Sequence, residues 1–207
     1  MLGLPKSTEM RKRLPKKTVY AKFQMNNAAK EKIDADISRI TIANEITPSK
    51  INISAGEKVS SFFVLSVTLK RKDFDEKNII TLSKLIPQKI LFVLEYENES
   101  KLAIFHTKLM QTDWKPTEQY SIELRGLSLD TVWENIVIDV GGLSMEQGNT
   151  LDEQIEINEK RQKLEKEIAK YEKQARAERQ PKKKFEFANK VKELKRALNT
   201  LKITEEN

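Results

Sequence analysis

The chain has 207 residues, with 38 Lys and Arg against 31 Asp and Glu, which gives a net charge of +7. It contains no cysteine and one histidine, His106, so disulfides, thiolate metal sites, cysteine nucleophiles and paired histidine ligands are excluded. No apolar run approaches the roughly 20 residues of a membrane span. The N-terminus also lacks an apolar signal segment, so we expect a cytoplasmic protein with no membrane contact.

The first 22 residues carry seven basic side chains against a single acid, Glu9. Pro5 and Pro15 disfavour one continuous helix, because proline lacks an N–H and restricts the residue before it. We therefore predict an extended basic arm over residues 1–22, in which Arg11, Lys12 and Arg13 are candidate phosphate contacts.

Residues 23–144 hold most of the branched and aromatic side chains, and the patterns predict a helix, three strands and a second helix in the first half of this stretch. The predicted ranges are 26–38, 40–46, 51–53, 59–69 and a helix from Asp73 or Asp75 to just before Pro87. Three further strands and a helix follow. They are predicted at 90–95, 102–107 and 120–124, with the helix beginning after Ser128 and ending at Gly141-Gly142. This order predicts an α+β domain with a largely antiparallel sheet and flanking helices.

The pattern of apolar residues over 150–203 predicts a separate helical hairpin. Apolar residues recur at alternating spacings of three and four on both sides of Gln180-Pro181, as expected for an antiparallel coiled coil. The predicted seam residues are Ile157, Leu164, Ile168, Tyr171 and Ala175 in the first helix, and Phe187, Val191, Leu194, Leu198 and Leu201 in the second.

The greater part of the hairpin, residues 161–202, carries more positive charge than the net charge of the whole chain. Residues 161–202 contain 15 Lys and Arg against six Asp and Glu, a net +9, whereas residues 23–160 have a net −6. Such a charge run is often only a solvated helix surface, but few of these cations have an acid four residues away. We therefore expect contact with a DNA or RNA backbone. The candidate residues are Arg176, Arg179, Lys182, Lys183, Lys184, Lys190, Lys192, Lys195 and Arg196.

No catalytic, metal or cofactor site is predicted. Glu99-Ser100-Lys101, with Asp73 and Asp75 upstream, matches the acidic and lysine residues of metal-dependent nucleases, which hold a divalent ion and activate water. We expect Glu99 in a hairpin turn, where it is poorly placed for that chemistry. Trp114, next to Asp113 in a loop, is expected to close the core rather than to bind a ligand.

Several short segments together resemble an uncharacterised bacterial family known only as a domain of unknown function. They are Gly3-Leu4-Pro5 with Ser7-Thr8, Leu14-Pro15-Lys16, residues 91–96, Thr112-Asp113-Trp114, Leu127-Ser128-Leu129-Asp130 and the basic region 178–185. Members of such families are often encoded beside helicases and DNA methyltransferases in restriction-like or phage-defence loci. The resemblance implies an accessory role near DNA and a helicase or methyltransferase partner; it supplies no catalytic residue.

The sequence thus predicts a non-enzymatic accessory protein whose α+β body docks a larger partner and whose hairpin contacts nucleic acid. Two alternatives remain open. One is a protein–protein interaction module, whose hairpin binds an acidic protein surface or dimerises through residues 187–201. The other is a metal-dependent nuclease.

Overall fold

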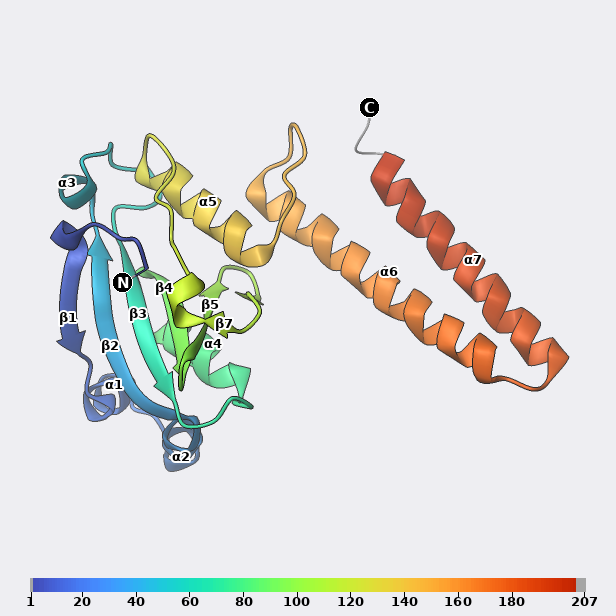
Figure 1. Cartoon of the computed structure of the whole chain (residues 1–207), viewed down its shortest axis with the longest axis horizontal. Helices are drawn as coiled ribbons and strands as arrows, with labels where there is room; N and C mark the ends of the chain where they lie inside the picture. The colour runs from blue at the N-terminus through green and yellow to red at the C-terminus, as the bar shows by residue number, and fades with distance from the viewer. Residues whose placement is uncertain (1, 204–207) are drawn as a thin grey trace. The chain divides into compact units, whose positions relative to one another are not determined.

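The computed structural model describes residues 2–203, with side chains through residue 201, and the chain forms two compact units, Met1–Gly142 and Leu143–Asn207. The first unit is built on a β-sheet, and the second contains the two longest helices (Figure 1).

A mixed sheet forms the centre of the first unit. Its strands lie in the order β1-β2-β3-β4-β5-β6, and β7 pairs with β5. All paired strands are antiparallel except β3 and β4, which are parallel because a helix connects them. The strands are β1 (Glu9–Arg13), β2 (Ile37–Ile46), β3 (Phe62–Leu69), β4 (Lys89–Tyr96), β5 (Glu99–Phe105), β6 (Leu109–Gln111) and β7 (Lys115–Pro116).

Three helices cover one face of this sheet (Figure 1): α1 (Lys16–Lys22), α2 (Asn27–Asp36) and α4 (Glu76–Leu85). Side chains alternate along a strand, so Ile40 of β2 and Leu65 of β3 point to the same helices. They form a core with buried residues of the helices, including Val19, Ile33 and Ile79. This packing buries the apolar side chains on that face of the sheet.

The opposite face is covered in part by α5 (Leu129–Gly141). The rings of Trp133 in α5 and Phe62 in β3 lie 5.2 Å apart between centroids. Ser128 caps the helix, since its Oγ accepts a hydrogen bond from the N–H of Thr131 at 3.4 Å. Gly142, with a φ of 58°, adopts the left-handed conformation that ends it.

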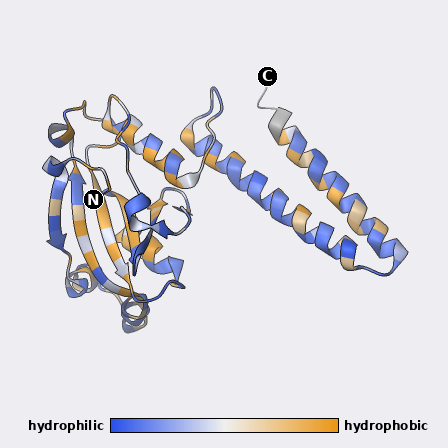
Figure 2. Cartoon of the chain, viewed as in Figure 1, coloured by the Kyte–Doolittle hydropathy of each residue, from blue (hydrophilic) through white to orange (hydrophobic). Residues whose placement is uncertain are grey.

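The prediction of an α+β fold with a largely antiparallel sheet and a C-terminal hairpin is confirmed. Figure 2 shows hydrophobic residues interspersed with hydrophilic ones along the central strands, whereas β1 is mostly hydrophilic. Two short strands were predicted wrongly. The strand predicted at 51–53 is absent: Ile51 ends the helix α3 (Pro48–Ile51), which proline is well suited to begin, and residues 52–53 form no strand. Residues 120–124 follow the 3₁₀ helix η2 (Thr117–Gln119) and also form no strand.

The structure also differs in the first 22 residues, which belong to the first unit. After the 3₁₀ helix η1 (Lys6–Thr8), β1 pairs with β2 as the edge strand of the sheet, with Lys12 opposite Ile42. Val19 of α1 is buried in the core. The basic arm is therefore the outer edge of the folded sheet and the helix next to it.

The second unit contains α6 (Leu151–Ala177) and α7 (Pro181–Ile203), which pack against each other. Thr150 and Glu153 begin α6 with reciprocal hydrogen bonds between side chain and backbone, a capping box. Along the predicted seam, Ile168 and Leu194 are each only 8% exposed.

Candidate functional site

The tip of the hairpin is the three-residue turn between α6 and α7 together with the helix ends next to it. It holds five cations, Arg176, Arg179, Lys182, Lys183 and Lys184, with Glu178 as the acid between them. Tyr171 and Phe187 pack in the seam below, with ring centroids 6.1 Å apart. The seam thus holds the two helix ends together and fixes where the cations project.

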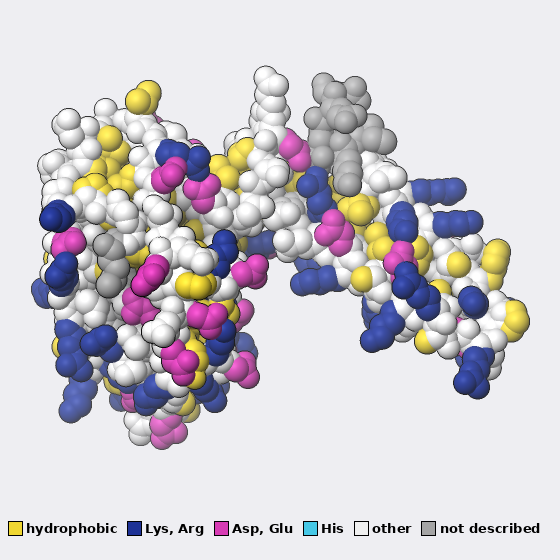
Figure 3. Space-filling view, in the orientation of Figure 1, with side chains coloured by type: hydrophobic (Ala, Val, Ile, Leu, Met, Phe, Trp, Pro, Cys, Tyr) yellow, Lys and Arg dark blue, Asp and Glu magenta, His cyan; other side chains and the backbone are white. Residues whose placement is uncertain are grey.

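All nine basic residues predicted on the hairpin are exposed, and Figure 3 shows Lys and Arg side chains spread over the visible face of both helices. Lys195 pairs with Glu172 at 2.8 Å, and Lys190 pairs with Glu193 at 3.2 Å. The other seven have no acidic partner within 4.0 Å among the described residues. These seven, the unpaired hairpin cations, are Arg176, Arg179, Lys182, Lys183, Lys184, Lys192 and Arg196.

Glu178 is bound by backbone rather than by a cation. Its carboxylate accepts hydrogen bonds from the N–H groups of Arg179 and Gln180, both at 2.9 Å. The hydrogen bond from Gln180 is the main reason that the pKa of Glu178 lies below its ordinary value, and the charge of Lys183 adds to it. Glu178 therefore stabilises the turn before α7 and does not form an ion pair with the guanidinium and ammonium groups around it.

Lys182, Lys183 and Lys184 lie in the first turn of α7, which contains no acid. The N-terminus of a helix carries partial positive charge, so cations there are unfavourable. A fold that needed only a stable hairpin would place Asp or Glu at these positions. The arrangement instead concentrates positive charge at this helix terminus.

The other three predicted basic residues lie in the first unit. Arg11, Lys12 and Arg13 are consecutive on β1, where every residue is exposed. Arg11 pairs with Glu9 at 2.8 Å and has a φ of 48°, in a β-bulge between Glu9 and Lys12. The twelve predicted residues are thus divided between two surfaces, nine on the hairpin and three on the sheet edge.

Glu99 and Lys101 of the nuclease motif are engaged in other contacts. Glu99 is the first residue of β5, and not part of the turn as predicted, because the turn is formed by Glu97 and Asn98. Its carboxylate pairs with Lys72 at 2.5 Å. Across the described residues, no group of three Asp, Glu or His side chains is placed to hold a metal ion.

Lys101, the lysine of the same motif, lies between two aromatic rings. Its Nζ is 5.3 Å from the ring centroids of both Phe74 and Trp114, which are favourable cation–π distances. Partial burial lowers the pKa of Lys101, while the charges of Glu76 and Asp113 oppose that change. Trp114 packs against the core, so this tryptophan closes the edge of the core beneath two lysines, Lys72 and Lys101.

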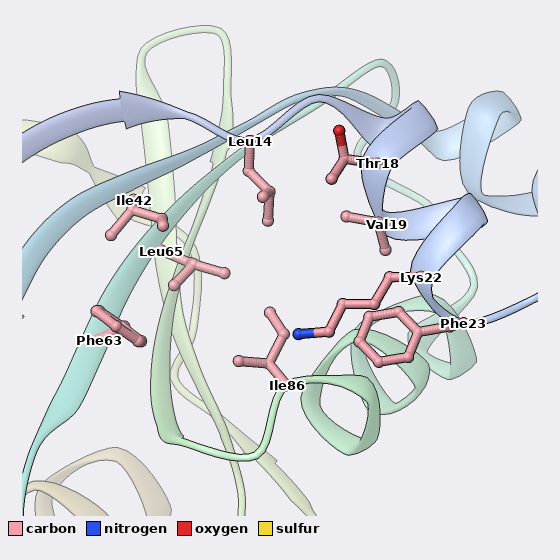
Figure 4. A pocket seen from close by; sticks show the side chains of 9 residues that line it. All are labelled: Leu14, Thr18, Val19, Lys22, Phe23, Ile42, Phe63, Leu65 and Ile86. Atoms are coloured by element: carbon pink, nitrogen blue, oxygen red, sulfur yellow. The ribbon is translucent and has the colours of Figure 1, made fainter.

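Sequence reasoning also missed an apolar cavity of about 150 Å³, which lies between α1 and the sheet (Figure 4). Val19 and Phe23 line it from the side of α1, Leu65 from the sheet, and Ile86 from the end of α4. Lys22 extends its ammonium group toward Ile86 (Figure 4). The cavity depends on how α1 sits on the sheet, a non-local property that no periodicity in the sequence reveals.

The fold and these surfaces define a class of protein: a mixed α+β sheet unit joined to a basic helical hairpin. No helix among residues 2–203 is long and apolar enough to cross a membrane. The chain belongs to the family described as Domain of unknown function (DUF4391), whose model matches residues 2–198. Neither a curated protein nor a solved structure matches the chain significantly.

Proposed function

We propose that the protein is a non-enzymatic accessory component of a DNA-processing or defence system. The tip of its hairpin contacts the phosphate backbone of DNA or RNA, and its α+β unit docks a larger protein. The observation that carries the proposal is the set of seven unpaired hairpin cations, five of them within nine residues around the turn.

Electrostatics favours a polyanion as the partner of this surface. The five tip cations repel one another, and the α7 terminus adds to the positive potential. Each phosphate bound would relieve part of that repulsion and release condensed counterions from the nucleic acid. Lys192 and Arg196 lie further along α7 and would extend the contact along the strand.

The contact would be to backbone and not to stacked bases. Phe185, 67% exposed, is the aromatic residue closest to the lysines of the tip, and Phe187 is used in the seam against Tyr171. Single-strand binding surfaces usually offer several aromatic platforms in a row. We therefore expect binding that depends little on nucleotide sequence.

The docking half of the proposal rests on the resemblance, because families of this kind are often encoded beside helicases and DNA methyltransferases. A DNA-processing enzyme is therefore the expected partner. Purification of the native complex under mild conditions, followed by mass spectrometry, tests it. A helicase or methyltransferase retained in stoichiometric amount is the expected result, and a complex free of any such enzyme would contradict the docking role.

A salt titration tests the hairpin contact. Fluorescence anisotropy of a random-sequence DNA duplex should give a binding constant that falls steeply with salt, with a log–log slope of about −0.9 for each phosphate contacted. Replacing Lys182, Lys183 and Lys184 together by Gln should weaken binding and reduce that slope by about 2 to 3.

The matched control replaces three exposed lysines of α6 by Gln: Lys163, Lys166 and Lys173. It changes the net charge equally but leaves the tip intact, so binding should weaken much less. Equal losses in both variants would show that net charge, and not the tip, attracts the duplex. Absence of duplex and RNA binding would favour the alternative of a hairpin that meets an acidic protein surface.

A further inference from the structure

The face of the sheet opposite α1, α2 and α4 is only partly covered, and beside the part that α5 covers lies a groove of about 580 Å³. Thr41 of β2 and Ser66 of β3 are opposite each other in the register and line its floor. Arg13 of β1 is opposite Thr41 and projects over the same face. In Figure 1 this face of β1, β2 and β3 is turned toward the viewer.

The small and polar side chains of the floor explain why the face is hollow. Thr41, Ala43 and Ser66 occupy positions that alternate with the apolar residues of the core face, so no large side chain fills the space above the strands. A volume of about 580 Å³ falls within the range of small-molecule sites. The groove lies wholly within the first unit.

Two guanidinium groups in this groove lack a partner. Arg13 and Arg39 both line it, and neither has an acid within 4.0 Å among the described residues, whereas Arg11 is held by Glu9 at 2.8 Å. The bulge in β1 lies between Glu9 and Lys12, so it sets the course of the edge strand that carries Arg11 and Arg13. Arginine binds phosphate through two parallel N–H donors, which makes this pair suited to one phosphate group.

A carboxylate stands at the other side of the groove. Glu95 of β4 lines it, is partly buried, and has no ion pair with a described residue. Next to it in the register is Thr68, whose buried Oγ1 also has no hydrogen-bond partner. A carboxylate accepts hydrogen bonds from hydroxyl or amino groups and repels phosphates.

We propose that this groove binds a phosphorylated small molecule of the nucleotide or sugar-phosphate class. Arg13 and Arg39 hold its phosphate, and Glu95 accepts hydrogen bonds from its sugar hydroxyls. Glu9 also lines the groove, but it is paired with Arg11. Glu95 on β4 lies two strands from Arg39 and three from Arg13, which suits a ligand with one anionic end and one hydroxyl-bearing end. A continuous nucleic-acid strand fits less well, because its next phosphates would meet Glu95.

Isothermal titration calorimetry with AMP as the probe tests the site, with inorganic phosphate and a single-stranded DNA oligonucleotide as comparison ligands. We expect saturable binding of AMP, weakened about tenfold or more by Arg39→Gln and by Arg13→Gln, since each removes a charge-assisted pair. Glu95→Gln should weaken AMP binding without weakening the binding of inorganic phosphate, which the carboxylate repels. Thermal unfolding of each variant verifies that the fold is kept.

The control replaces Lys182, Lys183 and Lys184 by Gln, which removes the hairpin tip and leaves the groove intact. AMP binding unchanged in this variant supports the groove as a site independent of the proposed nucleic-acid contact. Equal loss in the hairpin and arginine variants, absence of AMP binding, or binding of the oligonucleotide alone would each overturn the proposal. A Glu95→Gln effect as large on phosphate as on AMP would overturn the assigned role of the carboxylate.

Discussion

The Nδ2 of Asn78 donates a hydrogen bond of 2.7 Å to the carboxylate of Asp36, and both side chains are buried. This contact joins the end of α2 to α4. The same carboxylate accepts hydrogen bonds from the N–H of Asp75 at 2.8 Å and from the Nε of Arg71 at 2.6 Å. One buried acid therefore fixes the start of the crossover helix that makes β3 and β4 parallel.

Asp36→Ala should lower the free energy of unfolding by about 3 kcal/mol, because it removes a buried charge and leaves the donors of Asn78 and Asp75 without their acceptor. Denaturant unfolding measures the change. Arg71→Gln is the control: its side chain is 59% exposed, so its loss should cost less than about 1 kcal/mol. Similar losses in both variants would mean that the ion pair, and not the buried network, carries the stability.

Phe187→Ala should destabilise the hairpin by about 2 kcal/mol, since it removes the ring that packs on Tyr171. Phe185→Ala is a matched control, because that ring is largely exposed and should be close to neutral. Circular dichroism during thermal unfolding follows the loss of helix. A concentration-dependent mass in the native protein, removed by Phe187→Ala, would instead indicate that the seam joins two chains.

The hairpin could be predicted from sequence because all of its information is local. The seam repeats along each helix, and the basic residues of the tip are adjacent in the chain. Its seam residues Ile168 and Leu194 are buried as the spacing predicts. The charge of the tip is likewise a property of consecutive residues, so the candidate surface was visible before any fold was known.

The edge strand β1 escaped prediction for the opposite reason. All five of its residues are exposed, so it has no alternation of apolar and polar side chains, and only backbone pairing with β2 makes it a strand. Residues 120–124 alternate as a strand does, but Ile122 pairs through its N–H with the carbonyl of Leu2 at 2.9 Å outside any ladder. The groove was invisible because Arg13, Arg39 and Glu95 meet only through the pairing of four strands.

The cavity under α1 predicts a substitution that stabilises the protein. Val19→Ile should raise the free energy of unfolding by about 0.8 kcal/mol, because the added methylene enters the apolar space of about 150 Å³. Val19→Ala, which enlarges the cavity, should destabilise instead. Chemical denaturation of both variants measures the two effects. Destabilisation by Val19→Ile would show that the cavity wall cannot accept even one further methylene.

Asp130 anchors the loop before β3, accepting hydrogen bonds of 2.7 to 3.2 Å from the N–H groups of Glu57, Lys58 and Val59. Partial burial raises the pKa of Asp130, but these hydrogen bonds outweigh it and hold the pKa below its ordinary value. Its stabilising effect should therefore be complete above the ordinary carboxyl pKa and disappear as the pH falls through the lowered pKa.

Melting temperatures measured across the acid range test this linkage. Asp130→Asn should be less stable than the wild type at neutral pH, and the difference should shrink as the pH falls. Glu118→Gln, at an exposed position, should show no such convergence. A constant difference between Asp130→Asn and wild type at every pH would mean that ionisation of Asp130 contributes nothing to the loop.

Glu178→Gln should strengthen nucleic-acid binding. The amide oxygen of Gln can still accept hydrogen bonds from Arg179 and Gln180, so the start of α7 keeps its contacts, while the negative charge next to Lys183 is removed. Anisotropy with a DNA duplex at low salt should give a tighter binding constant, and the gain should fade as salt screens the tip. Glu156→Gln, an exposed acid far down α6, makes the same change in net charge and should have little effect. Equal gains in the two variants would show that the net charge of the whole chain, and not the tip, attracts the duplex. Weaker binding by Glu178→Gln would show that the carboxylate itself orders the turn that presents the lysines.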